Sequence, residues 1–193
     1  MRTALLSAVA LVALVVAIPG VSATTPRPKA MVLTVRDLPT GFKNDRGSGY
    51  RSTAAAATEN SATVDQYQAW GFVNEYEVGF TRHASLDDVT NRGGATNITS
   101  SITTYRAASG AEKSLASRAK KCRIAPSHEL PVGAKIGGEA HLCGIHDVFT
   151  AQVYVVIWRH GSFTAAVAVA GLSSGVSPAQ AVRLALRQDR RMR

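Results

Sequence analysis

The sequence has little of what metal sites and nucleic-acid interfaces need. Only two cysteines occur in 193 residues, so there is no paired C-x-x-C motif of the kind that holds zinc. Aromatic residues make up 6% of the chain, and no basic run alternates with them as in nucleic-acid-binding surfaces. No internal repeat is visible. We therefore expect no metal, no cofactor and no nucleic-acid partner.

Long hydrophobic runs are also scarce, and the main one lies at the N-terminus. Arg2 precedes an apolar run over residues 4–18, and Val21-Ser22-Ala23 places small residues where a signal peptidase cleaves. The run has about 15 residues, fewer than the roughly 20 that span a bilayer. No cysteine follows it for lipid attachment. We predict that residues 1–23 are a removed signal peptide and that the protein is secreted, with an uncleaved anchor as the alternative.

Acidic residues are outnumbered, with 13 Asp and Glu against 22 Lys and Arg. Residues 1–23 hold one base and no acid, so the secreted chain would carry a net charge of +8 instead of the +9 of the whole chain. Outside a cell, this charge favours loose contact with anionic wall polymers or lipid head groups. Solubility alone is the simpler explanation.

The two cysteines, Cys122 and Cys143, both lie in the secreted part of the chain. An even number of cysteines in an exported protein predicts a disulfide bond. It would close a loop of about 22 residues and contribute on the order of 3 kcal/mol. The alternative is a zinc site in which His141 and His146 join the cysteines, but an oxidising compartment favours the disulfide.

Residues 24–29 contain prolines and no apolar pattern, which predicts a flexible leader. Residues 30–193 are predicted to form a single domain. Alternating apolar residues predict strands over residues 71–81 and 96–105, the first with a solvated face that carries its two glutamates. Residues 43–60, which are polar and rich in Gly, Ser, Thr and Ala, are predicted to be a loop.

Two helices are expected beside these strands. Ser109 and Glu112 match a capping box, which predicts that a helix starts there. Its buried stripe, spaced four, four and three residues, is Ala111, Leu115, Ala119 and Cys122. Ser177-Pro178 supplies an N-cap and a first-turn proline for a last helix that covers the sheet, with its arginines in solvent.

The predicted fold is organised around residues 149–172, two β-rich runs that meet at His160-Gly161. A two-residue loop ending in glycine predicts a tight hairpin. Both faces of this hairpin are apolar, so it should lie inside a sheet that is covered on each side. The fold class is therefore α+β, an antiparallel sheet with a central hairpin, flanked by helices.

The same hairpin carries the candidate ligand-binding residues. One predicted face holds Tyr154 and Trp158, which would bind a ligand only if that face is exposed. The other face holds Ala166, Ala168 and Ala170, whose small side chains would either let a helix approach closely or leave room for a ligand.

Catalytic patterns are incomplete. Residues 171–175 match the G-x-S-x-G elbow around Ser173, but only Asp189 and no histidine follows, whereas hydrolases of that kind need both. Glu75 and Glu77 could act as an acid and base pair, although a solvated strand face explains them more simply. The incomplete sets favour a protein that is not an enzyme.

A series of short motifs runs through residues 31–191. They are Asp37-Leu38-Pro39-Thr40-Gly41-Phe42, a strand from Trp70-Gly71 to Phe80-Thr81-Arg82, Tyr105 before a helix ending in Cys122, Ile136-Gly137-Gly138-Glu139-Ala140, and Trp158-Arg159-His160-Gly161. In this order they resemble exported bacterial proteins related to the extracellular sensor domains of Ser/Thr kinases and to lipoproteins of the PsbP-like fold. The resemblance implies a sheet flanked by helices, a groove proposed for ligand sensing, and no established catalysis. The chain has neither a kinase segment nor a lipid-attachment cysteine.

We therefore expect a secreted, non-enzymatic domain that binds a small or polymeric ligand at the cell surface. The alternative is a basic structural protein that adheres to the wall or the membrane surface. A hydrolase is the weakest of the three hypotheses. Charge and motif spacing select neither a particular ligand nor an oligomeric state.

Overall fold

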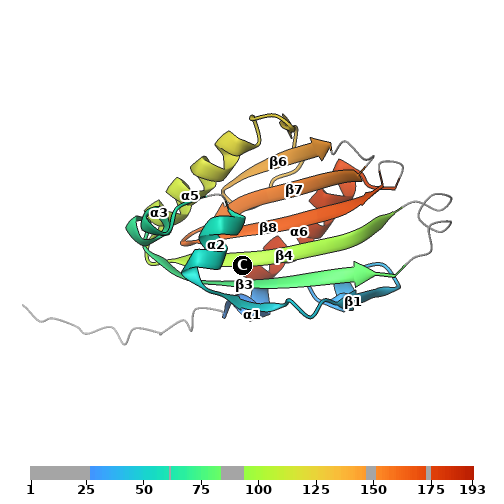
Figure 1. The fold of residues 1–193 in the computed structure, drawn as a ribbon, viewed down its shortest axis with the longest axis horizontal. Coiled ribbons are helices and arrows are strands. Elements are labelled where there is room, and N and C mark those ends of the chain that lie inside the picture. Colours follow the sequence, from blue (N-terminus) through green and yellow to red (C-terminus); the bar gives the residue numbers. More distant parts are fainter. Residues whose placement is uncertain (1–26, 61, 84–93, 147–150, 173–174) are drawn as a thin grey trace, which may run out of the picture.

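The computed structural model describes residues 27–60, 62–83, 94–146, 151–172 and 175–193. Its centre is an eight-stranded antiparallel sheet with helices on both faces (Figure 1). The predicted α+β fold is thereby confirmed. The predicted signal peptide lies outside the described residues. Within the described ranges, no helix is long and apolar enough to cross a membrane.

The helices and strands have the following bounds along the chain. The helical segments are α1 (Pro28–Met31), the 3-10 turn η1 (Val35–Asp37), α2 (Thr53–Glu59), α3 (Val64–Ala69), α5 (Ala108–Lys121) and α6 (Pro178–Met192). The strands are β1 (Phe42–Asn44), β2 (Gly49–Arg51), β3 (Phe72–Arg82), β4 (Ala95–Tyr105), β5 (Ser127–Leu130), β6 (Glu139–His146), β7 (Ala151–His160) and β8 (Phe163–Leu172). Across the sheet they run β1-β3-β4-β8-β7-β6-β5, and β2 also pairs with β3. The β7–β8 hairpin is therefore an interior part of the sheet, as predicted.

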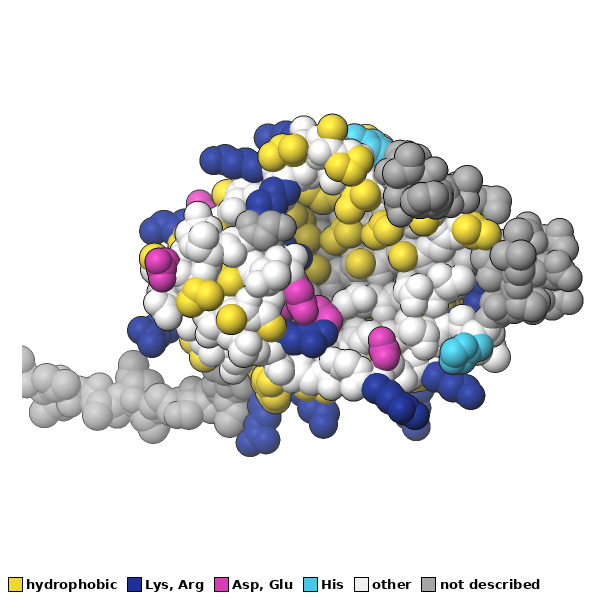
Figure 2. Space-filling view, viewed as in Figure 1, with side chains coloured by type: hydrophobic (Ala, Val, Ile, Leu, Met, Phe, Trp, Pro, Cys, Tyr) yellow, Lys and Arg dark blue, Asp and Glu magenta, His cyan; other side chains and the backbone are white. Residues whose placement is uncertain are grey.

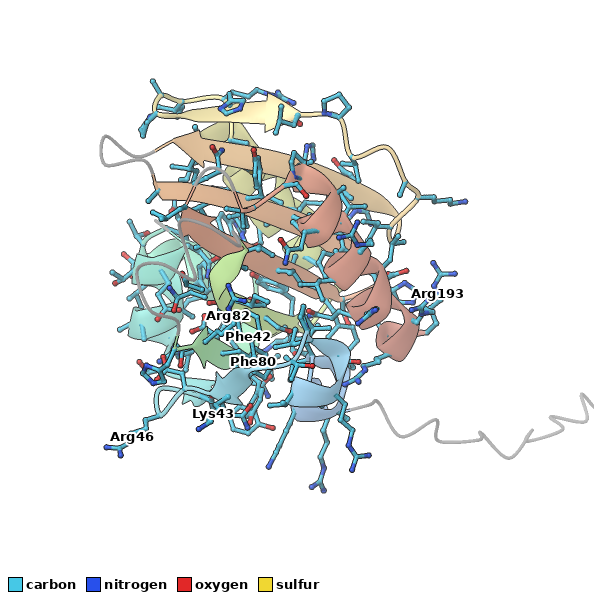
Figure 3. All side chains as sticks on the ribbon, turned by 90° about the vertical axis from the view of Figure 1, so that its right-hand side faces the viewer. Phe42, Lys43, Arg46, Phe80, Arg82 and Arg193 are labelled. Atoms are coloured by element: carbon cyan, nitrogen blue, oxygen red, sulfur yellow. A yellow bond between two sulfur atoms is a disulfide. The ribbon has the colours of Figure 1, made fainter. Side chains whose placement is uncertain are left out.

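One face of the sheet is closed by α6 and α1. Seen from the end of the sheet, α6 lies on one side and α2 and α3 lie on the other (Figure 3). Most side chains that point toward α6 from the interior strands are fully buried; they include Ile102, Val156, Trp158, Val167 and Val169. This layer is the main hydrophobic core. At the near end of Figure 3, the Arg82 guanidinium carbon lies 6.0 Å from the centre of the Phe42 ring.

The hairpin register differs from the prediction. A turn at His160-Gly161 would pair Trp158 with Phe163, so the observed pairing is shifted by two residues. The observed turn is Gly161-Ser162, with Gly161 at a φ of 56°, so His160 pairs with Phe163 and Trp158 pairs with Ala165. Glycine adopts this positive φ without steric cost. Because side chains alternate with a period of two, a shift of two leaves every residue on its predicted face.

Helix α5 crosses the opposite face and buries its predicted stripe. Ala111 and Leu115 are completely buried, and Cys122 at the C-cap is also buried. Cys122 forms the predicted disulfide with Cys143 of β6, and their Cα atoms are 5.1 Å apart. The disulfide therefore fixes the C-terminal end of α5 to the sheet.

The predicted capping box at the start of α5 is wrong. The helix begins at Ala108 with Ala107 as N-cap, and no side chain caps it. Directly before it, the Arg106 N–H donates to the Gly71 carbonyl at 2.8 Å, which holds the chain against the start of β3. This tertiary contact fixes where the chain turns into α5. The helix therefore begins before Ser109, and Ser109 lies inside its first turn.

The prediction of a loop over residues 43–60 is also wrong. The segment contains β2 and α2, and the hydroxyl of Ser52 caps α2 by accepting from the Ala55 N–H at 3.2 Å. Four consecutive alanines give this helix high intrinsic propensity but no amphipathic pattern to recognise. At the N-terminus, α1 starts at Pro28, so its first two residues belong to the predicted leader.

Candidate functional site

A hollow lies on the sheet face that α5 and α2 cover only in part. Figure 2 shows hydrophobic side chains gathered in it, with acidic and basic side chains side by side at one end. The hollow consists of two adjoining cavities of about 190 Å³ and about 130 Å³, which share Glu59, Asn60, Arg118 and Val155. We call the two together the sheet hollow.

The two halves of the sheet hollow differ in chemistry. The apolar half is lined mainly by Cys122, Cys143, Ile145, Val155 and Ile157. The polar half is lined by Glu75, Glu77, Thr99, Ser101, Ala166 and Ala168. Side chains in this row of the sheet are short, because Val155 pairs with Ala168 and Ala168 pairs with Thr99. The hollow therefore has an apolar floor at the centre of the sheet.

Three carboxylates from two elements meet in the polar half. Glu59 at the end of α2 joins Glu75 and Glu77 of β3, and their nearest carboxylate oxygens all lie within 4.8 Å of one another. Arg51 of β2 donates from Nη2 to Glu77, and its Nε lies 3.6 Å from Glu59 Oε1. Partial burial, followed by repulsion from Glu77, raises the pKa of Glu59. The cluster therefore carries more carboxylates than bound cations.

Glu75 is the buried member of this cluster, at 1% exposure, so the predicted solvated face of β3 is wrong at this position. Its Oε2 accepts from the Thr103 hydroxyl and, at 3.4 Å, from the Asn60 amide. Its Oε1 has no hydrogen-bond partner among the described residues. Burial raises the pKa of Glu75 more than the Thr103 hydrogen bond and the charge of Arg118 lower it.

Two cations from α5 face the carboxylates. Arg118 lines both halves of the sheet hollow. It forms no hydrogen bond or ion pair with another residue that the structure describes, although its charge acts on Glu75. Lys121 donates to the Asn60 carbonyl at 2.9 Å, and partial burial, aided by the nearby Arg118, lowers its pKa. Cations from α5 and carboxylates from α2 and β3 thus line the same hollow.

The carboxylate cluster has the ligand type that divalent cations prefer. In this structure, however, Arg51 already binds Glu77, and Arg118 adds a second positive charge nearby. Each guanidinium opposes the entry of a metal ion. The arrangement suits a polar organic ligand better than a bare cation.

The five predicted ligand-binding residues lie on both faces of the sheet. Ala166 and Ala168 line the sheet hollow, and Ala170 lies on the same face one step further along β8. Trp158 is completely buried on the opposite face, and Tyr154 is half-buried there against the main core. The structure therefore brings together only the alanines of this set.

Most of the charged residues that line the sheet hollow carry no recognisable signal in the sequence. No sequence pattern assigns Arg118 or Lys121 to a site, and Glu59 falls in the loop predicted over residues 43–60. Glu75 and Glu77 were noticed as a carboxylate pair, which was the one available signal.

Within the described part of the chain, the other sequence candidates form no second site. Both cysteines of the alternative zinc site are in the disulfide. His141 instead contacts Glu129 Oε1 at 2.7 Å and Glu139 Oε1 at 3.2 Å, and the His146 side chain lies outside the described structure. Ser173 is also outside it.

Comparison with known proteins places the fold but not the activity. No family model and no curated protein sequence matches the chain. Among solved structures, it is similar to the extracellular domain of PknH from Mycobacterium tuberculosis, with a TM-score of 0.53 and 8% identity. The match covers 85% of this chain and 95% of that domain. The expected likeness to extracellular kinase domains is confirmed at the level of the fold, while the likeness to PsbP-like lipoproteins stays a prediction.

Proposed function

We propose that this protein is a secreted, non-enzymatic domain that binds a small ligand in the sheet hollow. The observation that carries the proposal is the contrast between the two faces of the central hairpin. Val156 and Val167 are completely buried on one face, whereas Val155 and Ala168 on the other are only half-buried. An apolar concave floor with a few converging polar groups is the general form of a small-molecule site.

Two further observations support a location outside the cytoplasm. Cys122 and Cys143 form a disulfide, and such bonds persist mainly in oxidising compartments. The similar solved structure is described as an extracellular domain. Both agree with the signal peptide expected at residues 1–23.

A bulky side chain on the floor of the sheet hollow tests the proposal. We expect wild-type protein to bind a small apolar fluorophore, N-phenyl-1-naphthylamine, saturably, and Ala168→Trp to bind it at least about tenfold more weakly because the indole fills the site. Ala116→Trp, at an exposed position of α5, is the matched control and should bind like wild type. Equal binding by all three proteins would refute the proposed site.

Adhesion to an anionic surface is a second candidate function. Arg183, Arg187 and Arg190 are exposed on α6, and Asp189, the acidic residue of that helix, is buried at 1% exposure. The outer face of α6 is therefore positively charged without an exposed acid to balance it. This face is separate from the sheet hollow, so the two functions can be tested independently.

A further inference from the structure

The polar half of the sheet hollow is lined by Glu75, a buried carboxyl group with one oxygen that lacks a hydrogen-bond donor. Glu75 Oε1 is buried and has no hydrogen-bond partner among the described residues, although Oε2 of the same carboxyl has two. A buried oxygen left without a donor costs free energy. A ligand N–H group placed in the polar half would satisfy it.

The surrounding charge favours a positively charged donor. Glu59 and Glu77 lie beside Glu75, and among the described residues Arg51 is the one cation that forms ion pairs in this cluster, with Glu59 and Glu77 but not with Glu75. An ammonium group would add a second positive charge and could donate up to three hydrogen bonds. The chemistry of this wall therefore matches a primary amine.

On the α5 side of the sheet hollow, the charged side chains are hydrogen-bond donors, which would bind an acceptor on the ligand. Arg118 lines both halves and has no hydrogen-bond or ion-pair partner within the described part of the chain. A guanidinium presents several N–H groups in a planar fork that matches a carboxylate. A ligand carboxylate next to Arg118 would also be near Lys121, which lines the apolar half.

Both charged walls adjoin the apolar floor. Glu59, Arg118 and Val155 line both cavities, so a single small molecule at their junction can reach a carboxylate, a guanidinium and an alkyl side chain. Beyond the junction, Ile145 and Ile157 extend the apolar wall.

From these three groups together we infer that the sheet hollow binds a small zwitterion with an aliphatic side chain, the chemistry of a branched-chain amino acid or a short apolar peptide. This inference rests on the proposed function and specifies its ligand class. A ligand with only a positive charge would leave Arg118 beside a like charge, and one with only a negative charge would meet three carboxylates.

Three molecules with the same branched alkyl chain separate the possibilities. L-leucine carries both charges, 3-methylbutylamine carries only the ammonium group, and 4-methylpentanoate carries only the carboxylate. In calorimetric titrations of the exported, oxidised and dialysed protein, we expect saturable binding of L-leucine, at least about tenfold tighter than binding of either analogue. An equal affinity for the amine or for the acid would overturn the inference.

Variants assign the two charges. Arg118→Gln should weaken L-leucine binding at least about tenfold but should not weaken binding of the amine, because it removes a like charge. Glu75→Gln should weaken both. Lys113→Gln, at an exposed position of the same helix, is the matched control and should behave like wild type. Unchanged L-leucine binding in folded Arg118→Gln, verified by its melting temperature, would contradict the assignment.

Parallel titration with N-phenyl-1-naphthylamine distinguishes failure of the inference from failure of the proposed function. If wild type binds the fluorophore, Ala168→Trp does not, and L-leucine does not bind, the site stands but its zwitterionic ligand class is wrong. If neither probe binds, both the inference and the proposed site are overturned.

Discussion

Glu75 is a carboxyl group that the fold keeps out of water, at 1% exposure on the floor of the polar half. Burial raises its pKa above the ordinary value of 4.5. A carboxyl group with a raised folded pKa holds its proton more tightly in the folded state than in the unfolded state. Its contribution to stability is therefore complete below the unfolded pKa and is lost as pH rises through the folded pKa.

Replacing this carboxyl by a neutral amide should stabilise the protein above the raised pKa. Glu75→Gln removes the buried charge but keeps an oxygen that can accept from Thr103. We expect the free energy of unfolding to increase by on the order of 1 kcal/mol near about pH 8, with a smaller gain at about pH 4.5. Denaturant unfolding at both pH values measures the difference. Glu112→Gln on the exposed face of α5 is the control, and a variant destabilised equally at both pH values would contradict this account.

Gly110 shows a close contact that the helix pattern alone does not reveal. A Cβ atom at this position would lie 1.9 Å from the Trp70 carbonyl oxygen. Glycine inside a helix normally costs about 0.5–1 kcal/mol relative to alanine, but here alanine would force the backbones apart. Gly110→Ala should therefore lower the free energy of unfolding by more than about 1 kcal/mol.

The neighbouring residue supplies the control for this variant. Ser109 is exposed and is not the N-cap of α5, so Ser109→Ala should change the free energy of unfolding by less than about 0.5 kcal/mol. Chemical denaturation of both variants measures the effects. A stabilised Gly110→Ala would show that α5 and the Trp70 carbonyl are not in close contact.

Among the elements, α6 combines a predictable start with an unpredicted polar contact. The Ser177 hydroxyl caps its first turn by accepting from the Gln180 N–H, as predicted from Ser177-Pro178. Gln188, which the pattern leaves unassigned, is completely buried. Its Oε1 accepts from the Ser100 hydroxyl at 2.7 Å and its Nε2 donates to the Ser101 carbonyl at 3.0 Å. The amide therefore holds α6 to β4.

Removing this amide should loosen α6 from the sheet. Gln188→Leu is similar in size but takes away the acceptor of the Ser100 hydroxyl proton and the side-chain donor to the Ser101 carbonyl. We expect a loss of about 1–3 kcal/mol in the free energy of unfolding, since each buried polar group without a partner is costly. The double variant Gln188→Leu with Ser100→Ala should be less stable still, because Ser100 Oγ also accepts from the buried Leu33 N–H at 3.0 Å. Thermal unfolding of the two proteins provides the test, and a Gln188→Leu variant as stable as wild type would disprove the role.

Helices, strands and their buried faces could be predicted from the sequence only where they show an amphipathic pattern. The faces of the hairpin and the stripe that includes Leu115 followed from periodicity, because both elements bury one side. The polyalanine helix α2 has no such periodicity. Arg118 could not be assigned to the site either, since its direction depends on where α5 crosses the sheet, a tertiary feature that the disulfide at Cys122 helps to fix.

At the scale of the whole molecule, the two faces of the sheet are closed to different extents. Helix α6 and α1 cover the face that forms the main core, while α5, α2 and α3 leave the sheet hollow on the other (Figure 2). The fold thus supplies a buried core on one side and an apolar hollow on the other. Small residues such as Ala168 and Thr99 maintain the opening.

The charge of the whole molecule gives a separate prediction. If the exposed arginines of α6 bind an anionic surface, retention on phosphatidylglycerol vesicles should fall steeply between about 0.05 M and about 0.5 M salt, because salt screens exposed charges. The triple variant of Arg183, Arg187 and Arg190 to glutamine should be retained less than wild type at low salt. Cosedimentation measures both effects, and salt-insensitive retention would exclude this mode of adhesion.

The native mass of the exported protein tests the central claim most directly. We predict that wild type carries a small noncovalent mass that is lost on denaturation, that Ala168→Trp lacks it, and that Ala116→Trp keeps it. The denatured wild type should also weigh two hydrogens less than its reduced form because of the Cys122–Cys143 disulfide. An extra mass carried equally by Ala168→Trp, or none on wild type in any growth medium, would contradict ligand binding in the sheet hollow.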